Sequence, residues 1–281
     1  MNRTIIQQVQ GYETTDGAGV HLVRVLGGRT TDAYDPLLML DSFDSTDPEK
    51  YRAGFPLHPH RGIETISYLW KGRMVHKDSI GNHDEISDGE VQWMTAGSGI
   101  MHEEMLPESE RMLGVQLWLN LPQKYKMVKP NYHAIRRDDI QEVEFEGGFL
   151  RVIAGEYEDI KGYEAQYQPL TYYDIHLEEG ASLTLPTETD DSLMVFTLLG
   201  EISVEGDQVP EKTAAKLSEG NSVTLKAENG PAQILYVSSK RLDEPIAWGG
   251  PIVMNTTEEL EQAFVDLRTG HFIREEVDYD L

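Results

Sequence analysis

The sequence predicts an all-β protein made of two similar domains in tandem, with a single helix near the C-terminus. Three observations favour this fold class. Apolar and other residues alternate in many short runs, glycine-containing turns separate these runs, and the two halves of the chain repeat one another. The 281 residues are enough for two domains of ordinary size, each with its own core.

The clearest predicted strand covers residues 113–119, where leucine or valine occupies every second position. A period of two places these residues on one side of a strand, so we expect one apolar face. Turn-forming pairs such as Gly81-Asn82 and Asn229-Gly230 separate such runs along the chain. The further predicted strands cover residues 20–26, 36–40, 63–70, 91–94, 150–154, 193–199, 222–225 and 232–237.

One helix is predicted, over residues 257–268. Thr256 precedes Glu259 by three residues, which is the spacing of a capping box, and Gly270 follows the segment. Its apolar residues recur at helical spacing, so we expect the helix to pack this stripe against a sheet. These residues are Leu260, Ala263, Phe264 and Leu267.

The two halves of the chain match in their strand and glycine pattern. Residues 64–72 and 192–200 are both strand-like, and both end in a glycine. Gly89, with the strand that follows it, matches Gly220 and residues 222–225. A repeat of this length indicates two β-domains of similar fold.

The repeat predicts where the domains divide. We expect an N-terminal domain over residues 1–130 and a C-terminal domain over residues 131–281, which includes the helix. The junction is expected between about residues 122 and 148, a stretch rich in lysine, proline, aspartate and glycine.

The composition excludes several function classes. With no cysteine, the chain has no disulfide, no thiolate metal ligand and no cysteine nucleophile. A formal charge of −25 repels nucleic-acid phosphates and anionic membranes, so we expect neither as a partner. We find no apolar run near twenty residues and no apolar secretory segment, and we therefore expect a cytoplasmic protein without membrane spans.

Two short motifs carry candidate metal ligands. In a strand, residues i and i+2 point to the same side, so His58-Pro59-His60 presents two imidazoles together. The proline favours this extended form, because the residue before a proline avoids the α region. In His102-Glu103-Glu104, the same alternation groups His102 with Glu104 and turns Glu103 away. Three imidazoles and one carboxylate form a nitrogen and oxygen ligand set that suits a first-row divalent metal.

The repeat serves as an internal control for these ligands. Residues that only maintain the fold should recur in both copies, but the second half lacks all four candidates. Counting from the matched glycines, the places of His58, His60, His102 and Glu104 are taken by Pro186, Glu188, Gln233 and Leu235. Among the other histidines, His76 lies beside charged residues and is expected to be a solvated strand residue.

These motifs are similar to those of a known family. The pattern from Gly54 to Gly72 that contains His58, His60 and Glu64, followed by Gly89-x12-His102, resembles the paired motifs of the cupin superfamily. Three runs closely resemble the pirin family within it: HPHRGIET at residues 58–65, VQWMTAGSGIMH at residues 91–102 and GPIVMNT at residues 250–256. The resemblance extends from about residue 15 to residue 270.

The resemblance to pirins implies two tandem cupin β-barrels, a bicupin, with metal only in the N-terminal barrel. It implies His58, His60, His102 and Glu104 as ligands and iron as the usual metal, so we expect Fe(II), with Mn, Co, Ni or Zn as alternatives. In many cupins the carboxylate ligand instead occupies the position of Glu64. We favour Glu104 and expect Glu64 to orient a ligand imidazole.

Some members of the family oxidise quercetin, which implies a metal-dependent dioxygenase acting on a flavonol-like small molecule. Four protein ligands leave two positions free on an octahedral ion, and Glu104 could also serve as the base that takes the substrate's hydroxyl proton. Animal members are nuclear co-regulators, so the alternative is an iron-binding, redox-sensitive regulatory protein, without turnover, that binds a protein partner. A third reading is a degenerate cupin with a structural metal. We expect a monomer.

Overall fold

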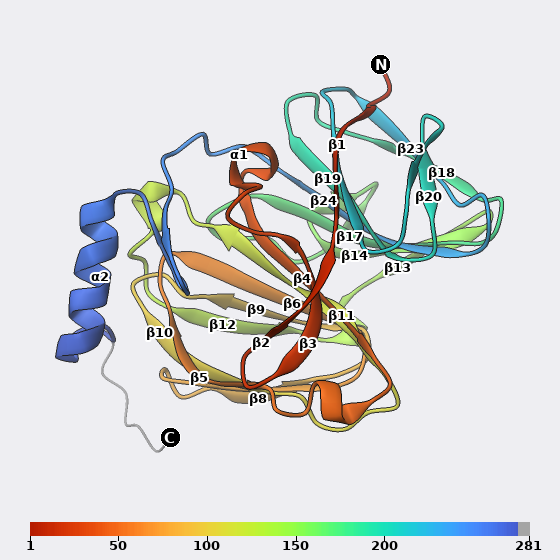
Figure 1. Ribbon diagram of the computed structural model, residues 1–281. Coiled ribbons are helices and arrows are strands. Elements are labelled where there is room, and N and C mark those ends of the chain that lie inside the picture. Colours follow the sequence, from red (N-terminus) through yellow and green to blue (C-terminus); the bar gives the residue numbers. More distant parts are fainter. Residues whose placement is uncertain (275–281) are drawn as a thin grey trace. The chain divides into compact units, whose positions relative to one another are not determined.

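The computed structural model describes residues 1–274, and β-strands form most of them, as the sequence predicts (Figure 1). These residues divide into two compact units, each built from separate stretches of the chain. We call the first the histidine unit; among the described residues it comprises residues 13–23, 37–137 and 242–274. We call the second the apolar unit; it comprises residues 1–12, 24–36 and 138–241.

This division differs from the predicted boundary at residue 130 in the placement of both ends of the chain. Strand β1 (Ile5–Gln10) pairs with β22 (Thr213–Leu217) in the apolar unit. Helix α2 (Thr257–Thr269) belongs to the histidine unit. Chain order could not predict these exchanges, because strand pairing and the burial of apolar faces decide which unit a terminal segment joins.

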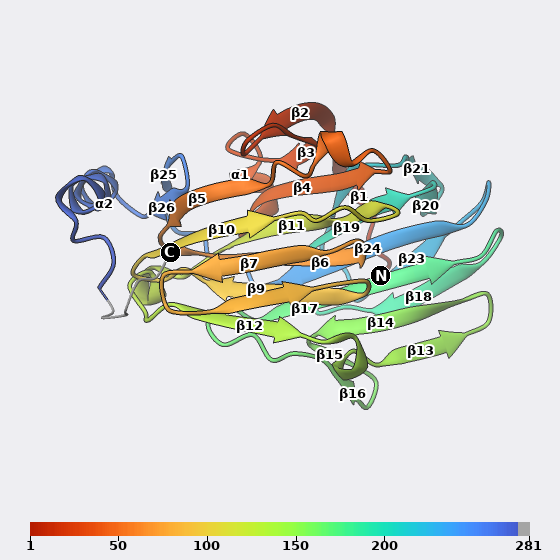
Figure 2. The same ribbon diagram turned by 90° about the horizontal axis from the view of Figure 1, so that it is seen from below.

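The histidine unit is built on two sheets, one of seven strands and one of four (Figure 2). The strand order is β12-β9-β6-β11-β4-β3-β2 in the larger sheet and β5-β10-β7-β8 in the smaller sheet. The larger sheet consists of β2 (Tyr12–Asp16), β3 (Val20–Leu26), β4 (Leu37–Ser45), β6 (Ile63–Lys71), β9 (Glu90–Thr95), β11 (Met112–Asn120) and β12 (Asn131–Ile135). The smaller sheet consists of β5 (Phe55–His60), β7 (Met74–Asp78), β8 (His83–Ile86) and β10 (Ile100–Met105).

The apolar unit repeats this arrangement. Its sheets have the orders β1-β22-β19-β24-β17-β14-β13 and β18-β23-β20-β21. The remaining strands of the larger sheet are β13 (Glu142–Phe145), β14 (Gly148–Ala154), β17 (Leu170–Leu177), β19 (Ser192–Leu199) and β24 (Ala232–Ser239). The other strands of this unit are β15 (Glu156–Tyr157), β16 (Ile160–Lys161), β18 (Ser182–Pro186), β20 (Ile202–Val204), β21 (Asp207–Val209) and β23 (Ser222–Lys226).

The matching sheet orders correct one part of the predicted repeat. β10, which carries His102, holds the same place in its sheet as β23 holds in the other unit. Counting from Gly89 and Gly220 instead pairs His102 with Gln233, which lies on β24 in the larger sheet. That count is wrong because a glycine before an alternating run marks a turn, but does not identify which strand follows.

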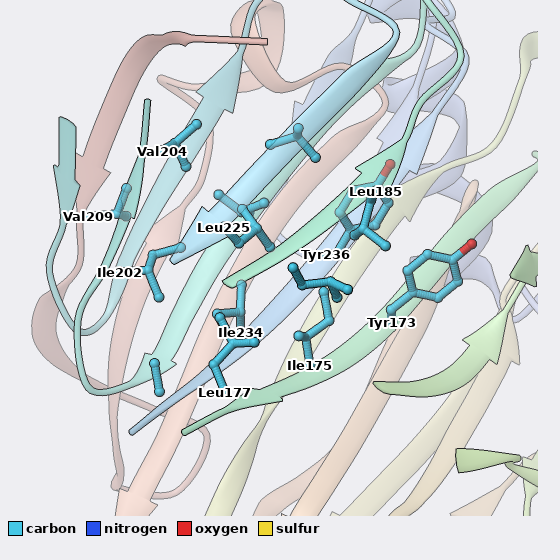
Figure 3. Packing of buried hydrophobic residues seen from close by; sticks show 14 of the residues in the cluster. Tyr173, Ile175, Leu177, Leu185, Ile202, Val204, Val209, Leu225, Ile234 and Tyr236 are labelled. Atoms are coloured by element: carbon cyan, nitrogen blue, oxygen red, sulfur yellow. The ribbon is translucent and has the colours of Figure 1, made fainter. Parts of the chain in front are cut away.

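Apolar side chains fill the space between the two sheets of the apolar unit (Figure 3). They include Leu183 and Leu185 of β18, and Val223 and Leu225 of β23. These two strands correspond in sheet order to β5 and β10, which carry the candidate ligands in the histidine unit. Neither β18 nor β23 contains a histidine or an acidic residue. The candidate ligand residues are therefore absent from the second copy in the corrected alignment as well.

Strand β11 differs from its prediction in one respect. The alternation predicts one apolar face, but all nine residues of β11 are buried. Both faces are therefore covered, and the face that carries Gln116 and Trp118 points toward the candidate ligands, as described below.

The predicted C-terminal helix is confirmed. Thr256 and Glu259 form the capping box, and Gly270 ends the helix with a φ of 79°. The helix packs against the strand pair β25 (Ala247–Gly249) and β26 (Ile252–Met254). The other helices are α1 (Thr31–Tyr34) and the 3-10 turns Pro48–Lys50, Gln123–Tyr125 and Arg137–Asp139. No helix among residues 1–274 is both long and apolar enough to cross a membrane.

Candidate metal centre

Two neighbouring strands of the smaller sheet carry the four predicted ligands. β5 holds His58 and His60, and β10 holds His102 and Glu104. The strands are antiparallel, with His102 directly opposite His58. The register shifts between His102 and Glu104, so that Glu104 lies opposite Phe55. This irregularity changes where the carboxylate points relative to β5.

The three imidazoles converge, as the sequence predicts. The Nε2 atoms of His58 and His60 lie 3.0 Å apart. The ring of His102 lies 4.3 Å from that of His58 and 5.0 Å from that of His60, measured between ring centroids. His60 and His102 are buried, whereas His58 is partly exposed, so the cluster meets solvent on the His58 side.

Backbone carbonyls orient two of the rings. His58 Nδ1 lies 2.8 Å from the carbonyl oxygen of Pro56, and His60 Nδ1 lies 3.0 Å from that of Pro251. A carbonyl only accepts, so each Nδ1 carries the proton, and the Nε2 of each neutral ring is a bare acceptor. Two bare acceptors at 3.0 Å cannot bond to each other. A shared cation satisfies both, and an imidazole held in this way is the usual form of a metal-binding histidine.

The buried imidazoles are neutral at pH 7. Burial, together with the nearby His58, lowers the pKa of His60 to about 3. Burial and the neighbouring histidines lower the pKa of His102 well below its ordinary value. Only a neutral imidazole can bind a metal, so these two rings need not lose a proton to do so.

The geometry fits a first-row metal ion. A metal–imidazole bond is about 2.1 Å long, so two imidazoles at a right angle around one ion have nitrogens ~3.0 Å apart. The Nε2 atoms of His58 and His60 have this separation, at 3.0 Å. His102 Nε2 is buried and has no hydrogen-bond partner among the described residues. A bound ion would supply the partner that this nitrogen lacks.

Glu104 does not group with all three predicted histidines; among potential ligands it groups with His102 and His76, and not with His58 or His60. A carboxylate oxygen of Glu104 lies within 4.8 Å of a ring nitrogen of His102 and of His76. Ring nitrogens of His102, His58 and His60 likewise lie within 4.8 Å of one another. Side chains from the larger sheet reach across to hold the Glu104 carboxylate. Gln92 of β9 donates to Oε1 at 2.5 Å, and Gln116 of β11 donates to Oε2 at 2.9 Å. The sequence pattern does not reveal these two amides, because burial of a polar strand residue depends on the facing sheet.

Glu64, the alternative carboxylate, lies in neither group of potential ligands. It is buried on β6, and its Oε1 accepts a hydrogen bond from Thr95 at 2.6 Å. Burial raises the pKa of Glu64, although the hydrogen bond from Thr95 opposes this effect.

His76 is the residue near the cluster that the sequence-based interpretation missed. It is fully buried on β7, next to β10, and not solvated as predicted. Its charged neighbour Lys77 suggested exposure, but Met74, His76 and Asp78 alternate with more exposed residues and share the buried face of β7. The period of two, starting from an apolar methionine, could have identified it.

Comparison with known proteins identifies the family. The pirin family model matches residues 19–119, and the model of the pirin C-terminal cupin domain matches residues 172–273. The chain belongs to the pirin family. The second domain is itself described as a cupin, and the structure is rich in strands with one short C-terminal helix. The predicted bicupin fold is therefore confirmed.

Individual relatives agree with this assignment. The chain is 41% identical over 278 residues to a Pseudomonas aeruginosa protein whose name provisionally assigns it as a quercetin 2,3-dioxygenase, covering 95% of this chain and 97% of that protein. It is 34% identical over 275 residues to human pirin, covering 96% of this chain and 93% of pirin. The crystal structure of a quercetin 2,3-dioxygenase from Acinetobacter baumannii superposes with a TM-score of 0.89 at 35% identity, covering 97% of this chain and 99% of that one.

Proposed function

We propose that this pirin is a metal-dependent dioxygenase that oxidises quercetin or a related flavonol. The observation that carries the proposal is the convergence of three imidazoles, two of them with a bare Nε2 that faces the other across 3.0 Å. The substrate class comes from relatives, since the Acinetobacter baumannii structure and the provisional name of the Pseudomonas aeruginosa protein both point to quercetin.

The residues that would hold the metal are His58, His60, His102 and Glu104. We expect one divalent ion per chain, with Fe(II) as the leading candidate and Mn, Co, Ni and Zn as alternatives, because the donors are nitrogen and oxygen without thiolate. A bound ion would supply Lewis acidity and, for a redox-active metal, electron transfer to dioxygen. Glu104 is favoured over Glu64 because it lies next to His102, whereas Glu64 is bonded to Thr95 and lies outside both ligand groups.

Glu104 is also our candidate for the base that takes the proton of the flavonol hydroxyl. Both of its oxygens already accept an amide hydrogen bond, from Gln92 and Gln116. Each carboxylate oxygen has two acceptor sites, so one site on each remains for a metal or a proton. The two amides hold the carboxylate in one orientation, as a ligand or base requires.

The test is the loss of quercetin coupled to oxygen uptake, measured for protein loaded with Fe(II), Mn(II), Co(II) or Ni(II). We expect at least one metal form to consume quercetin faster than the same metal without protein. His60→Ala should abolish this activity, whereas His83→Ala, at an exposed site on β8, should retain it.

If the protein binds one metal but no metal form consumes quercetin above the rate of free metal, the dioxygenase proposal fails. The alternative, an iron-binding regulatory protein without turnover, would then be the better account. Oxidation-dependent binding to a protein partner would be its next test.

A further inference from the structure

We propose that Asp78 and His76 are positioning residues that fix the tautomer of His102, so that its Nε2 remains free for the metal. The inference rests on the proposed role of His102 as a ligand, and it concerns a hydrogen-bonded chain behind that residue. The chain runs from Asp78 through His76 to His102, on the adjacent strands β7 and β10.

The first link joins Asp78 to His76. His76 Nε2 lies 2.8 Å from Asp78 Oδ2, and both side chains are fully buried. A carboxylate only accepts hydrogen bonds, so His76 carries its proton on Nε2. With a single proton, held on Nε2, His76 would present a bare Nδ1 at its other end.

Asp78 is itself held in place. Its Oδ1 accepts the backbone N–H groups of Ile80 and Asn82, both at 3.0 Å. Its Oδ2 also accepts the side-chain amide of Asn82 at 2.9 Å. The carboxylate cannot rotate without breaking several of these bonds, and so it imposes one tautomer on His76.

The second link joins His76 to His102. The Nδ1 atoms of the two rings lie 3.4 Å apart. With Nδ1 of His76 bare, His102 must carry its proton on Nδ1 to form this bond. The Nε2 of His102 is then the bare nitrogen, and it is the buried atom that has no hydrogen-bond partner among the described residues.

Packing and strand register keep the links aligned. Tyr132 stacks on the His76 ring, with centroids 4.4 Å apart and the planes inclined by 17°. β7 and β10 pair so that His102 lies opposite Asp78, and Glu104 lies opposite His76. The corresponding strand of the apolar unit, β20, has the residues Ile202, Ser203 and Val204 and no such pair. This hydrogen-bonded chain, which we call the relay, is therefore confined to the unit that has the candidate ligands.

Nuclear magnetic resonance of metal-free protein labelled with ¹⁵N-histidine tests the tautomers directly, without any variant. Long-range proton–nitrogen correlations should show His76 protonated on Nε2 alone, and His102 protonated on Nδ1 alone. His76 protonated on Nδ1, or on both nitrogens, would overturn the relay. This result does not depend on whether the protein has any oxygenase activity.

Metal affinity of two His76 variants tests the role. His76→Leu removes both links and should weaken binding of Co(II) about 10- to 100-fold, the usual effect of losing a group that orients a ligand histidine. His76→Asn places an amide oxygen near the former Nδ1 and should recover much of this loss. His83→Leu, on the neighbouring strand β8, is the matched control and should bind as tightly as wild type.

Counting the bound imidazoles separates positioning from direct ligation. His76 also groups with His102 and Glu104 at distances that a metal could bridge. Pulsed electron paramagnetic resonance of Cu(II)-loaded protein should find the same number of coordinated imidazoles in wild type and His76→Asn. One fewer in the variant would make His76 a ligand and overturn the proposal, as would an unchanged Co(II) affinity in His76→Leu. If wild type binds no metal at all, the proposed function fails, while the tautomers of the metal-free protein still decide the relay.

Discussion

At the residue scale, the candidate centre depends on imidazoles that stay neutral inside the protein. Burial lowers the pKa of His60 to about 3, whereas a histidine in the unfolded chain has its ordinary pKa of about 6.5. Between these values the unfolded chain binds a proton that the folded chain does not. The free energy of unfolding of the metal-free protein should therefore fall as the pH falls through this window.

Denaturant unfolding of metal-free protein at pH 7 and pH 5 measures this effect. Between these two pH values, His60 should contribute a loss of about 2 kcal/mol to the free energy of unfolding. His60→Leu lacks the titrating group, and its stability should fall by correspondingly less over the same range. If wild type and His60→Leu lost the same free energy of unfolding between pH 7 and pH 5, His60 would not be neutral and buried as described.

The two adjacent glutamates provide a matched comparison at the same scale. Glu104 is 1% exposed and bonded to two amides, whereas Glu103 on the same strand is only partly buried. Glu104→Ala should weaken metal binding strongly, since it removes a proposed ligand, and Glu103→Ala should leave it nearly unchanged. Metal titration of both variants decides this. Equal metal affinities of the two variants would show that Glu104 is not a ligand.

The sequence predicts that the candidate histidines of β5 lie together, for a simple physical reason. The separation of two residues in His58-Pro59-His60 fixes the side of the strand on which both imidazoles lie. Gln92 and Gln116 could not be found in the same way, because their importance comes from the side chains of the facing sheet that they contact. Such contacts are set by the tertiary fold, and a single polar residue in a strand gives no signal of them.

At the scale of elements, a buried arginine connects the helix α2 to the strand end that carries His60. The Arg61 guanidinium donates to Asp266 of α2 at 2.7 Å and to the carbonyls of Ser98 and Phe272 at 2.7 and 3.0 Å. The Arg61 side chain is only 2% exposed. Removing its acidic partner would leave a buried charge without its main compensation.

Asp266→Ala should therefore lower the free energy of unfolding by about 3–5 kcal/mol. The control is Glu85→Ala, which breaks an ion pair to Arg73 in which both side chains are well exposed, and it should lower the free energy of unfolding far less. Urea unfolding followed by circular dichroism measures both. A cost for Asp266→Ala no greater than that for Glu85→Ala would show that the Arg61 anchor does not stabilise the fold.

The sequence predicts elements more reliably than their surroundings. The strand over residues 20–26 has its predicted bounds, and the helix extends only one residue beyond residue 268. These elements are marked by local signals, namely alternation, a capping box and a terminal glycine. Burial of both faces of β11 is not a local property, because it depends on what packs against the sheet.

At the scale of the whole molecule, the structure differs most from the predicted division of the chain at residue 130. Strand β1 joins the apolar unit and α2 joins the histidine unit, so each unit includes a distant terminal segment. The repeat in the sequence indicates two similar folds, which is confirmed, but a repeat does not show which unit a segment outside it joins.

The placement of the tryptophans makes metal binding observable in one unit. The chain has four tryptophans, and all of them lie in the histidine unit: Trp70, Trp93, Trp118 and Trp248. A ligand that binds only the folded state stabilises it by about 2.7 kcal/mol at a hundred times its dissociation constant. Zn(II) should therefore raise the urea midpoint detected by tryptophan fluorescence in wild type and not in His102→Ala. A midpoint that Zn(II) leaves unchanged in wild type would argue against a site in this unit.

We expect one metal ion to bind between the imidazoles of the histidine unit. Anomalous diffraction from crystals of the metal-reconstituted protein, collected at the absorption edge of the metal, tests it most directly. We expect one peak per chain, about 2.0–2.2 Å from the Nε2 atoms of His58, His60 and His102. A peak in the apolar unit, a peak away from these three nitrogens, or no peak after reconstitution would contradict it.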